Sequence, residues 1–292
     1  MKQFSSYLAA SALLAAVCLP TPASLTAATT IAAANANAYG ANLGWINWLA
    51  DTNNGAVIGE YVCSGNLYSA NVGWISLGSG APTNGIYYQN QSAGDYGVNQ
   101  DGLGNLRGCA WGANIGWVVF ETNGAPQVDL YTGNLSGSVW SANCGWISLS
   151  NALAQVQTTS IRPGALAANG LPTAWLLANF GTTTVTAGAD PDGDGQSNQQ
   201  EYLAGTNPND QTSILRITSV HRGLAGDPAR IDMQWTPNAT RYYAIQQCSA
   251  LGGTNTWSDL FVCPWFNTSN VAFDDQSPTR FYRLRAFRPL MP

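Results

Sequence analysis

One motif occurs four times in the first half of the chain, and it limits the folds that this region can adopt. Each copy has an aromatic residue, Gly or Ser, Ala-Asn, a variable residue and then Gly-Trp. The Trp residues of successive copies are 29, 43 and 29 positions apart. Four copies at such spacings indicate a repeat architecture, in which neighbouring units bury each other's apolar faces. A barrel, a propeller and an open sheet are all compatible with this pattern. The four copies are Tyr39–Trp45, Tyr68–Trp74, Trp111–Trp117 and Trp140–Trp146.

Each copy is predicted to form two antiparallel strands joined by a tight turn. Ala-Asn-x-Gly favours the turn, because Asn and Gly adopt positive φ more readily than other residues. After the Gly-Trp pair, large apolar residues recur at every second position, which is the period of a strand. These residues should form the core face of a sheet: Ile46 and Trp48, Ile75 and Leu77, Val118 and Phe120, Ile147 and Leu149.

The repeated aromatic residues fall on the opposite face of the same strands, and two interpretations of them stay open. They flank the turn and are expected to face each other as cross-strand pairs. A Trp side chain buries roughly 200 Å², so the rings would stabilise the fold if neighbouring units covered them. Left exposed, they would form rows of rings suited to stacking on sugars. These candidate ligand-binding residues are Tyr39, Trp45, Tyr68, Trp74, Trp111, Trp117, Trp140 and Trp146.

The units resemble the G-x-A-W-S-x-N-x-G-W-I-x-F repeats of secreted bacterial proteins over residues 31–150. The resemblance implies an extracellular location and no particular chemistry. The first copy departs from it, because it lacks the upstream glycine that the other three copies have at Gly65, Gly108 and Gly137.

Three cysteines lie in the repeat region. Cys63 and Cys144 take positions that are apolar in other copies, which favours small core residues. Cys109 falls in a polar column of the repeat alignment. A disulfide among the three also stays open, because an exported protein can form one.

The segment DPDGDGQSNQQE, residues 190–201, is the most specific local motif. Its spacing is that of a calcium-binding loop with a glycine, Gly195, at the sharp turn. Calcium prefers six to eight oxygen ligands, and the lack of nitrogen and sulfur donors argues against zinc or copper. The predicted Ca²⁺ ligands are the side chains of Asp190, Asp192, Asp194, Asn198 and Glu201 and the backbone carbonyl of Gln196.

Two short helices are predicted to flank this loop. The first should begin near Pro172 and end before Gly181, and the second should begin near Ser197. With EYLAGTNPND after it, the loop resembles the thrombospondin type 3 calcium repeats of secreted bacterial proteins. The resemblance implies a structural calcium that stiffens a junction between domains. Only one copy is present, whereas the family often has several in tandem.

Six alternating segments, separated by turn residues, predict a small β-sandwich in residues 213–292. WSDL and PTRFYRLRAF resemble fibronectin type III-like modules of secreted bacterial proteins, which implies a spacer or a binding module. Cys248 and Cys263 lie close in sequence and are predicted to form a disulfide. Four arginines near the C-terminus are interpreted as a solvated strand edge: Arg280, Arg283, Arg285 and Arg288.

The N-terminus and the composition favour export. Residues 1–27 combine Lys2, a short apolar run and small residues, which is typical of a secretory signal peptide. The run is too short to span a membrane. Charged residues make up 9% of the chain and the net charge is -5, which argues against a nucleic-acid partner. The expected localisation is secreted, extracellular or at the cell surface.

No catalytic residue is predicted. His221 is the only histidine, and the chain has neither G-x-S-x-G nor a P-loop lysine. A pair of carboxylates, as in glycoside hydrolases, is the one enzymatic alternative. The acidic residues of the repeat region, among them Glu60 and Asp101, are interpreted as turn or surface residues.

The sequence therefore predicts a mostly β, non-enzymatic protein. It should be an extracellular binding or adhesion protein that recognises polysaccharide or a cell-surface glycan through its aromatic rows. A self-associating surface or matrix protein and a carbohydrate-active hydrolase are the alternatives. The predicted parts are a signal peptide (1–27), a Gly-Trp repeat β domain (31–150), a linker (151–170), a helix with the calcium loop (171–212) and a β-sandwich (213–292).

Overall fold

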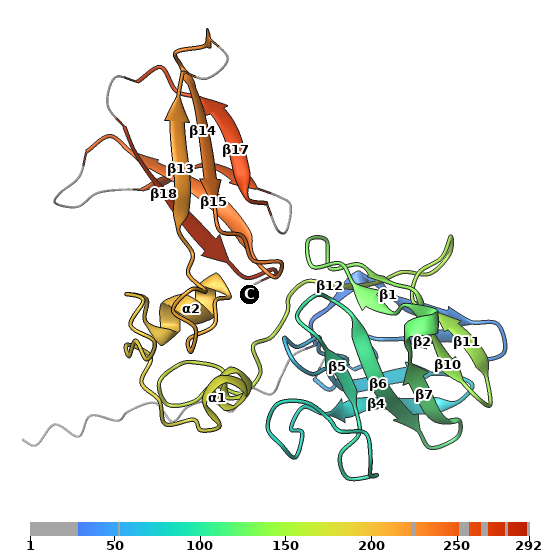
Figure 1. Cartoon of the computed structure of the whole chain (residues 1–292). Coiled ribbons are helices and arrows are strands. Elements are labelled where there is room, and N and C mark those ends of the chain that lie inside the picture. The colour runs from blue at the N-terminus through green and yellow to red at the C-terminus, as the bar shows by residue number, and fades with distance from the viewer. Residues whose placement is uncertain are drawn as a thin grey trace, which may run out of the picture.

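The structure is a computed structural model that describes residues 29–292 except 52, 224–225, 251–256, 264–267, 278–279 and 291–292. Figure 1 shows a β domain at the N-terminal end, short helices after it and further strands at the C-terminal end. Strands outnumber helices among the described residues, so the predicted mostly β fold is confirmed. The predicted signal peptide, residues 1–27, lies outside the described residues.

Each copy of the repeat forms one antiparallel hairpin, which confirms the predicted strand–turn–strand unit. We number these hairpins in chain order. Hairpin 1 is β1 (Ile31–Gly40) with β2 (Gly44–Asn47), hairpin 2 is β3 (Ser64–Ser69) with β4 (Gly73–Ser79), hairpin 3 is β6 (Leu106–Gly112) with β7 (Gly116–Phe120), and hairpin 4 is β10 (Ser138–Ser141) with β11 (Gly145–Ser148).

The four hairpins close into a barrel-like sheet. Their strands follow one another in chain order, and β11 pairs back with β1, where Tyr39 lies opposite Ser148. All the residues predicted for the core face are buried inside this sheet, among them Trp48 and Leu77. The alternation in the sequence thus predicted which side chains point inward, and the pairing of β11 with β1 decides between a barrel and an open sheet.

Short elements between and after the hairpins complete this domain, and one of them corrects a predicted boundary. β12 (Val156–Thr158) falls in the predicted linker 151–170, yet it pairs with β1, and Val156 belongs to the barrel core. The prediction was wrong because three residues give too short an alternation to recognise. The other elements are β5 (Val98–Gln100), η1 (Thr122–Gly124), β8 (Gln127–Val128) and β9 (Leu135–Ser136).

The glycine upstream of three motif copies marks a point where a neighbouring loop crosses the strand. A Cβ on Gly65 would lie 2.1 Å from the carbonyl oxygen of Gly55, and one on Gly137 would lie 2.2 Å from that of Ala125. Gly65 and Gly137 also have positive φ, +83° and +81°. The close carbonyl oxygen and the positive φ both favour glycine at these positions, because glycine has no Cβ to collide and adopts positive φ without strain.

The C-terminal part consists of two three-stranded sheets, with strand orders β13-β14-β17 and β16-β15-β18. Met233 and Trp235 of the first sheet meet Tyr243 and Ile245 of the second in one buried cluster, as a β-sandwich requires. All six predicted strands are present: β13 (Ile217–Arg222), β14 (Arg230–Trp235), β15 (Tyr242–Cys248), β16 (Ser258–Cys263), β17 (Asn270–Asp274) and β18 (Phe281–Phe287).

The predicted disulfide between Cys248 and Cys263 is wrong. Cys263 lies opposite Tyr243 on β15, five residues away from Cys248, which at ~3.4 Å per residue corresponds to about 17 Å. A disulfide needs Cα atoms within about 7 Å. The other cysteines that the structure describes are free as well. Cys63 and Cys144 are buried, and burial raises the pKa of the Cys63 thiol to about 12.

Both predicted helices are present between the two β domains. α1 (Thr173–Phe180) starts after Pro172 and ends at Gly181. α2 (Asn198–Ala204) starts after Ser197, whose hydroxyl accepts the backbone N–H of Gln200. The Gln200 side chain accepts the backbone N–H of Ser197 in return, which completes a capping box.

Candidate binding surface and metal site

The repeated aromatic residues form four cross-strand pairs on the outside of the barrel. In each hairpin the first aromatic residue lies directly opposite the Trp, as Tyr39 lies opposite Trp45 and Trp140 opposite Trp146. The ring centroids of a pair are 4.6–5.2 Å apart, and the ring planes meet at 58–67°. This tilted, edge-to-face geometry is one that aromatic rings prefer, and the predicted pairing is confirmed.

All eight rings are exposed to solvent, with exposed fractions from 37% at Trp140 to 51% at Trp74. The interpretation of these rings as a packed second layer is therefore wrong. Trp48, by contrast, is 2% exposed and lies inside the barrel. We call the exposed rings the aromatic belt: Tyr39, Trp45, Tyr68, Trp74, Trp111, Trp117, Trp140 and Trp146.

The repeated Asn of each turn binds the neighbouring hairpin. Its side-chain amide donates a hydrogen bond of 2.9–3.1 Å to the backbone carbonyl of the variable residue in the preceding turn. The bonds run from Asn71 to Leu43, from Asn114 to Val72, from Asn143 to Ile115, and from Asn42 to Cys144, which closes the circle. We call these four residues the Asn ring.

The Asn ring corrects the predicted role of this residue. Positive φ in the turns belongs to the glycines alone, with φ of +71° to +79° at Gly44, Gly73, Gly116 and Gly145. The Asn is repeated because each copy joins two hairpins. Sequence analysis missed this role, because the bonded residues are 28 to 102 positions apart and meet only in the closed sheet.

Beside the aromatic pair, farther from the turn, each hairpin has a second outward-facing cross-strand pair. In three hairpins it is polar. The side chains of its first members, Asn37, Asn66 and Ser138, make no hydrogen bond within the described part of the chain, so they remain able to bind a ligand. These pairs are Asn37 with Asn47, Asn66 with Ser76, and Ser138 with Ser148.

Hairpin 3 departs from this pattern. Its second pair is Cys109 opposite Val119, which offers no strong hydrogen-bonding group. The ring of Tyr96, from the preceding loop, packs edge-on against Trp117 with centroids 5.2 Å apart. Tyr96 therefore covers one edge of Trp117, and the hollow that remains at this hairpin is lined by loop residues 90–93 as well as by Trp117 and Val119.

The acidic loop brings its predicted carboxylates together. One oxygen from each of Asp190, Asp192 and Asp194 lies within 4.8 Å of the others. Asp192, Asp194, Asn198 and Glu201 each have a buried side-chain oxygen without a hydrogen-bond partner in the described chain. A buried oxygen without a partner costs about 1–3 kcal/mol, and a cation bound by all four would remove that cost.

The surroundings of Glu201 favour a cation in the same place. Glu201 is completely buried, and burial, with repulsion from Asp192 and Asp194, raises its pKa to about 7. Asp190 accepts the backbone N–H groups of Gly193 and Gly195, both at 2.9 Å, and so shapes the loop. The donors are all oxygens, the set that suits Ca²⁺.

Gln196 has a structural contact in addition to its predicted role. Its side-chain amide donates to the backbone carbonyl of Leu215, at the start of the C-terminal part. The use of its own backbone carbonyl as a calcium ligand stays a prediction.

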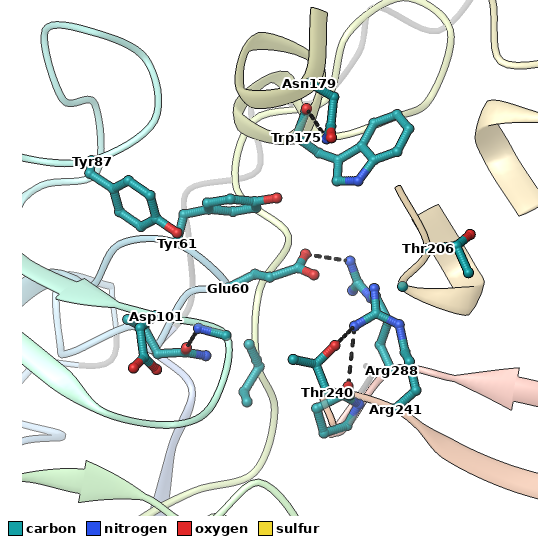
Figure 2. Close-up of a pocket in the computed structure, with 15 residues that line it drawn as sticks. Glu60, Tyr61, Tyr87, Asp101, Trp175, Asn179, Thr206, Thr240, Arg241 and Arg288 are labelled. Atoms are coloured by element: carbon teal, nitrogen blue, oxygen red, sulfur yellow. Dashed lines mark hydrogen bonds and ion pairs between the residues drawn. The ribbon is translucent and has the colours of Figure 1, made fainter. Parts of the chain in front are cut away.

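A cavity of about 250 Å³ lies where the barrel, the helices and the sandwich meet. Figure 2 shows Glu60 of the barrel pointing toward Arg288 of the sandwich. The Glu60 carboxylate accepts hydrogen bonds from Arg288 at 2.7 Å and from the Tyr202 hydroxyl at 2.8 Å. Arg241 donates to the carbonyls of Tyr202 and Leu203. Burial raises the pKa of Glu60, while Arg288 and Arg241 act to lower it.

This cavity corrects two predictions. Arg288, interpreted as part of a solvated edge, has a side chain that is 5% exposed. Glu60, interpreted as a turn or surface residue, is partly buried and forms an ion pair with the Arg288 guanidinium. Asp101 also lines the cavity, but its carboxylate accepts the backbone N–H groups of Leu103 and Asn105 in its own loop. Both acidic side chains of the cavity are thus held by structural partners, and nothing in the sequence pattern marked Glu60 as one of them.

Among the described residues, no helix combines the length and the apolar character needed to cross a membrane. Comparisons with protein-family models, with curated proteins and with solved structures found no match. Function must therefore be inferred from the geometry of the chain itself.

Proposed function

We propose that this chain is an exported, extracellular binding or adhesion protein that recognises neutral polysaccharide through its aromatic belt. The observation that carries the proposal is the exposure of all eight rings of the belt at one end of the barrel. A barrel whose interior is filled has no folding need for eight exposed aromatic side chains, and large exposed apolar patches mark interaction sites.

The chemistry around the belt favours sugars over other ligands. A pyranose ring has faces lined by C–H groups, which stack on Trp and Tyr, and hydroxyl groups at its edge. The unbonded amides of Asn37 and Asn66 and the hydroxyl of Ser138 are placed to bind such hydroxyls. None of the hairpin segments 39–48, 68–77, 111–120 and 140–149 contains a charged residue, so a neutral ligand matches the belt better than a polyanion or an anionic membrane does.

The acidic loop is proposed to hold one structural Ca²⁺. The support is the set of four buried oxygens without partners, all at predicted ligand positions. The same helix, α2, presents Glu201 to the loop and Tyr202 to the cavity between the domains. A cation bound at Glu201 would therefore also hold the residue that contacts Glu60 of the barrel and Arg241 of the sandwich.

Self-association in a surface or matrix layer is the second candidate, because exposed rings also suit contacts between copies. Both candidates are tested by pull-down of the full chain on hydroxyethyl cellulose, glycol chitin and β-1,4-mannan, with alginate as a polyanion control. Sedimentation at increasing protein concentration measures self-association in parallel. Retention on a neutral glycan by a monomeric chain supports the polysaccharide proposal. Concentration-dependent oligomers with no retention on any glycan would support self-association in its place.

Matched variants separate the belt from the rest of the surface. Replacing Trp45 and Trp74 together by Ala should weaken retention about tenfold, equal to about 1.4 kcal/mol. Tyr131→Ala is the control, because Tyr131 is 56% exposed and lies outside the belt. Equal losses in both variants would show that the belt has no special role.

A further inference from the structure

Because the sheet is closed, the four hairpins lie on four different sides of the barrel. In the strand order, hairpin 2 lies between hairpins 1 and 3, and hairpin 4 lies between hairpins 3 and 1. Hairpins 2 and 4 are therefore on opposite walls. An eight-stranded barrel has a backbone diameter of roughly 15 Å, and the rings of the belt point away from its axis. A straight glycan chain that lies on hairpin 2 cannot also lie on hairpin 4.

Three of the four hairpins carry a complete set of groups for a sugar. In hairpins 1, 2 and 4 an exposed aromatic pair stands beside a polar pair, led by Asn37, Asn66 or Ser138, whose side chain has no partner in the described chain. Hairpin 3 has Cys109 and Val119 in the polar positions, and Tyr96 packs against its Trp117. The other three hairpins each combine an exposed aromatic pair with a polar pair, which gives three candidate sites.

We propose that hairpins 1, 2 and 4 are three separate glycan sites, and that a single copy of this protein cross-links neutral polysaccharide chains. This inference rests on the proposed function. The belt is thus no continuous platform for one ligand. Each site binds weakly and independently, and the arrangement around a closed barrel directs the sites to different chains. An adhesive or matrix-building role follows from this valency without any oligomer.

The experiment counts sites per chain and then tests cross-linking. The full chain, shown to be monomeric by light scattering, is titrated calorimetrically with cellohexaose, chitohexaose or mannohexaose, whichever matches the retained polysaccharide. The expected stoichiometry is three hexasaccharides per chain. Mixing the chain with the long polysaccharide should raise turbidity, and excess hexasaccharide should abolish it.

Pair-deletion variants assign the sites. Replacing both aromatics by Ala in hairpin 1, 2 or 4 should lower the stoichiometry from three to two. The control is Tyr131→Ala, an exposed ring outside the belt, which should leave the stoichiometry at three. The double change in hairpin 3, Trp111→Ala with Trp117→Ala, tests whether that hairpin adds a fourth site. Removing the pairs of hairpins 1 and 2 together should leave one site and no turbidity. Circular dichroism and the unfolding midpoint confirm that each variant is folded.

Several results overturn the inference. One hexasaccharide per chain, with binding intact, would leave the proposed function standing and reject three separate sites. A loss of all binding on deletion of any single pair would show one continuous site. Loss of one site in the hairpin 3 variant would reject the assignment of hairpin 3 as the incomplete hairpin. No binding to any of the three polysaccharides would reject the proposed function together with the inference.

Discussion

The Asn ring and the acidic loop both gather short polar side chains at backbone turns, yet they differ in how their atoms are satisfied. Every amide of the Asn ring donates to a carbonyl of the preceding hairpin around the closed sheet. In the acidic loop, four buried oxygens have no partner within the described chain. A repeated polar residue with a partner in the protein explains the fold, whereas a cluster of buried polar atoms without partners points to a ligand outside the chain. The Asn ring should therefore need no ligand, whereas the loop should bind one. The described barrel has single buried atoms without a partner, such as Trp48 Nε1 and Ser141 Oγ, but only the loop gathers four such oxygens.

The largest expected effect tests whether the inner face alone holds the barrel together. Trp48→Ala empties a buried site and should lower the free energy of unfolding by about 4 kcal/mol. Trp45→Ala removes an exposed ring and one edge-to-face contact, so it should cost about 1 kcal/mol. Urea unfolding of both variants measures the difference. Similar losses in the two variants would mean that the belt is part of the core after all.

The next effect tests whether the acidic loop is incomplete. Ca²⁺ at a hundred times its dissociation constant should stabilise the chain by about 2.7 kcal/mol over the chelated form. Calorimetric unfolding with calcium and with a chelator measures this shift. Glu201→Gln should abolish it, because the ligand at the last loop position loses its charge. Asp210→Asn is the control, since Asp210 is bonded to Thr212 outside the cluster. An unchanged midpoint on addition of calcium to the parent chain would contradict the proposed site.

A smaller effect tests the Asn ring itself. Asn71→Ala removes one bond to the Leu43 carbonyl and should cost about 1 kcal/mol. Asn71→Asp should cost more, because it places an acceptor against that carbonyl oxygen. Asn37→Ala is the matched control in the same domain, and its stability should stay unchanged because its side chain has no partner in the described chain. If Asn37→Ala destabilised the chain as much as Asn71→Ala, the hydrogen bonds of the Asn ring would not explain the stability of the barrel.

The smallest expected effect concerns the cysteines. Reducing agents should leave the unfolding midpoint unchanged, because Cys248 and Cys263 are free and lie at opposite ends of the β15–β16 pairing. Titration of thiols in denaturant without reductant checks this directly. A deficit of two thiols in the monomeric chain would show that a disulfide is present, and mapping it to Cys248 and Cys263 would contradict the strand register.

Much of the local structure could be predicted from short stretches of the chain. Alternating apolar residues identified the inward faces of the hairpins and all six sandwich strands, because the period of a strand is visible in a few residues. Pro172, Gly181 and Ser197 located the helix ends. The spacing from Asp190 to Glu201 identified the loop, since its donors lie within one turn-and-helix segment.

Some features of this protein depend on contacts between segments that are far apart in the sequence, and only the tertiary structure decided them. The sequence by itself determined the hairpins, the outward position of the aromatic rings and the oxygen-lined loop. Closure through β11 and β1, the exposure of the rings, the bonds of the Asn ring and the contact of Glu60 with Arg288 required the folded chain. The physical reason is that periodicity and turn chemistry act over a few residues. Strand closure, burial and ion pairing depend on which segments far apart in the chain come into contact.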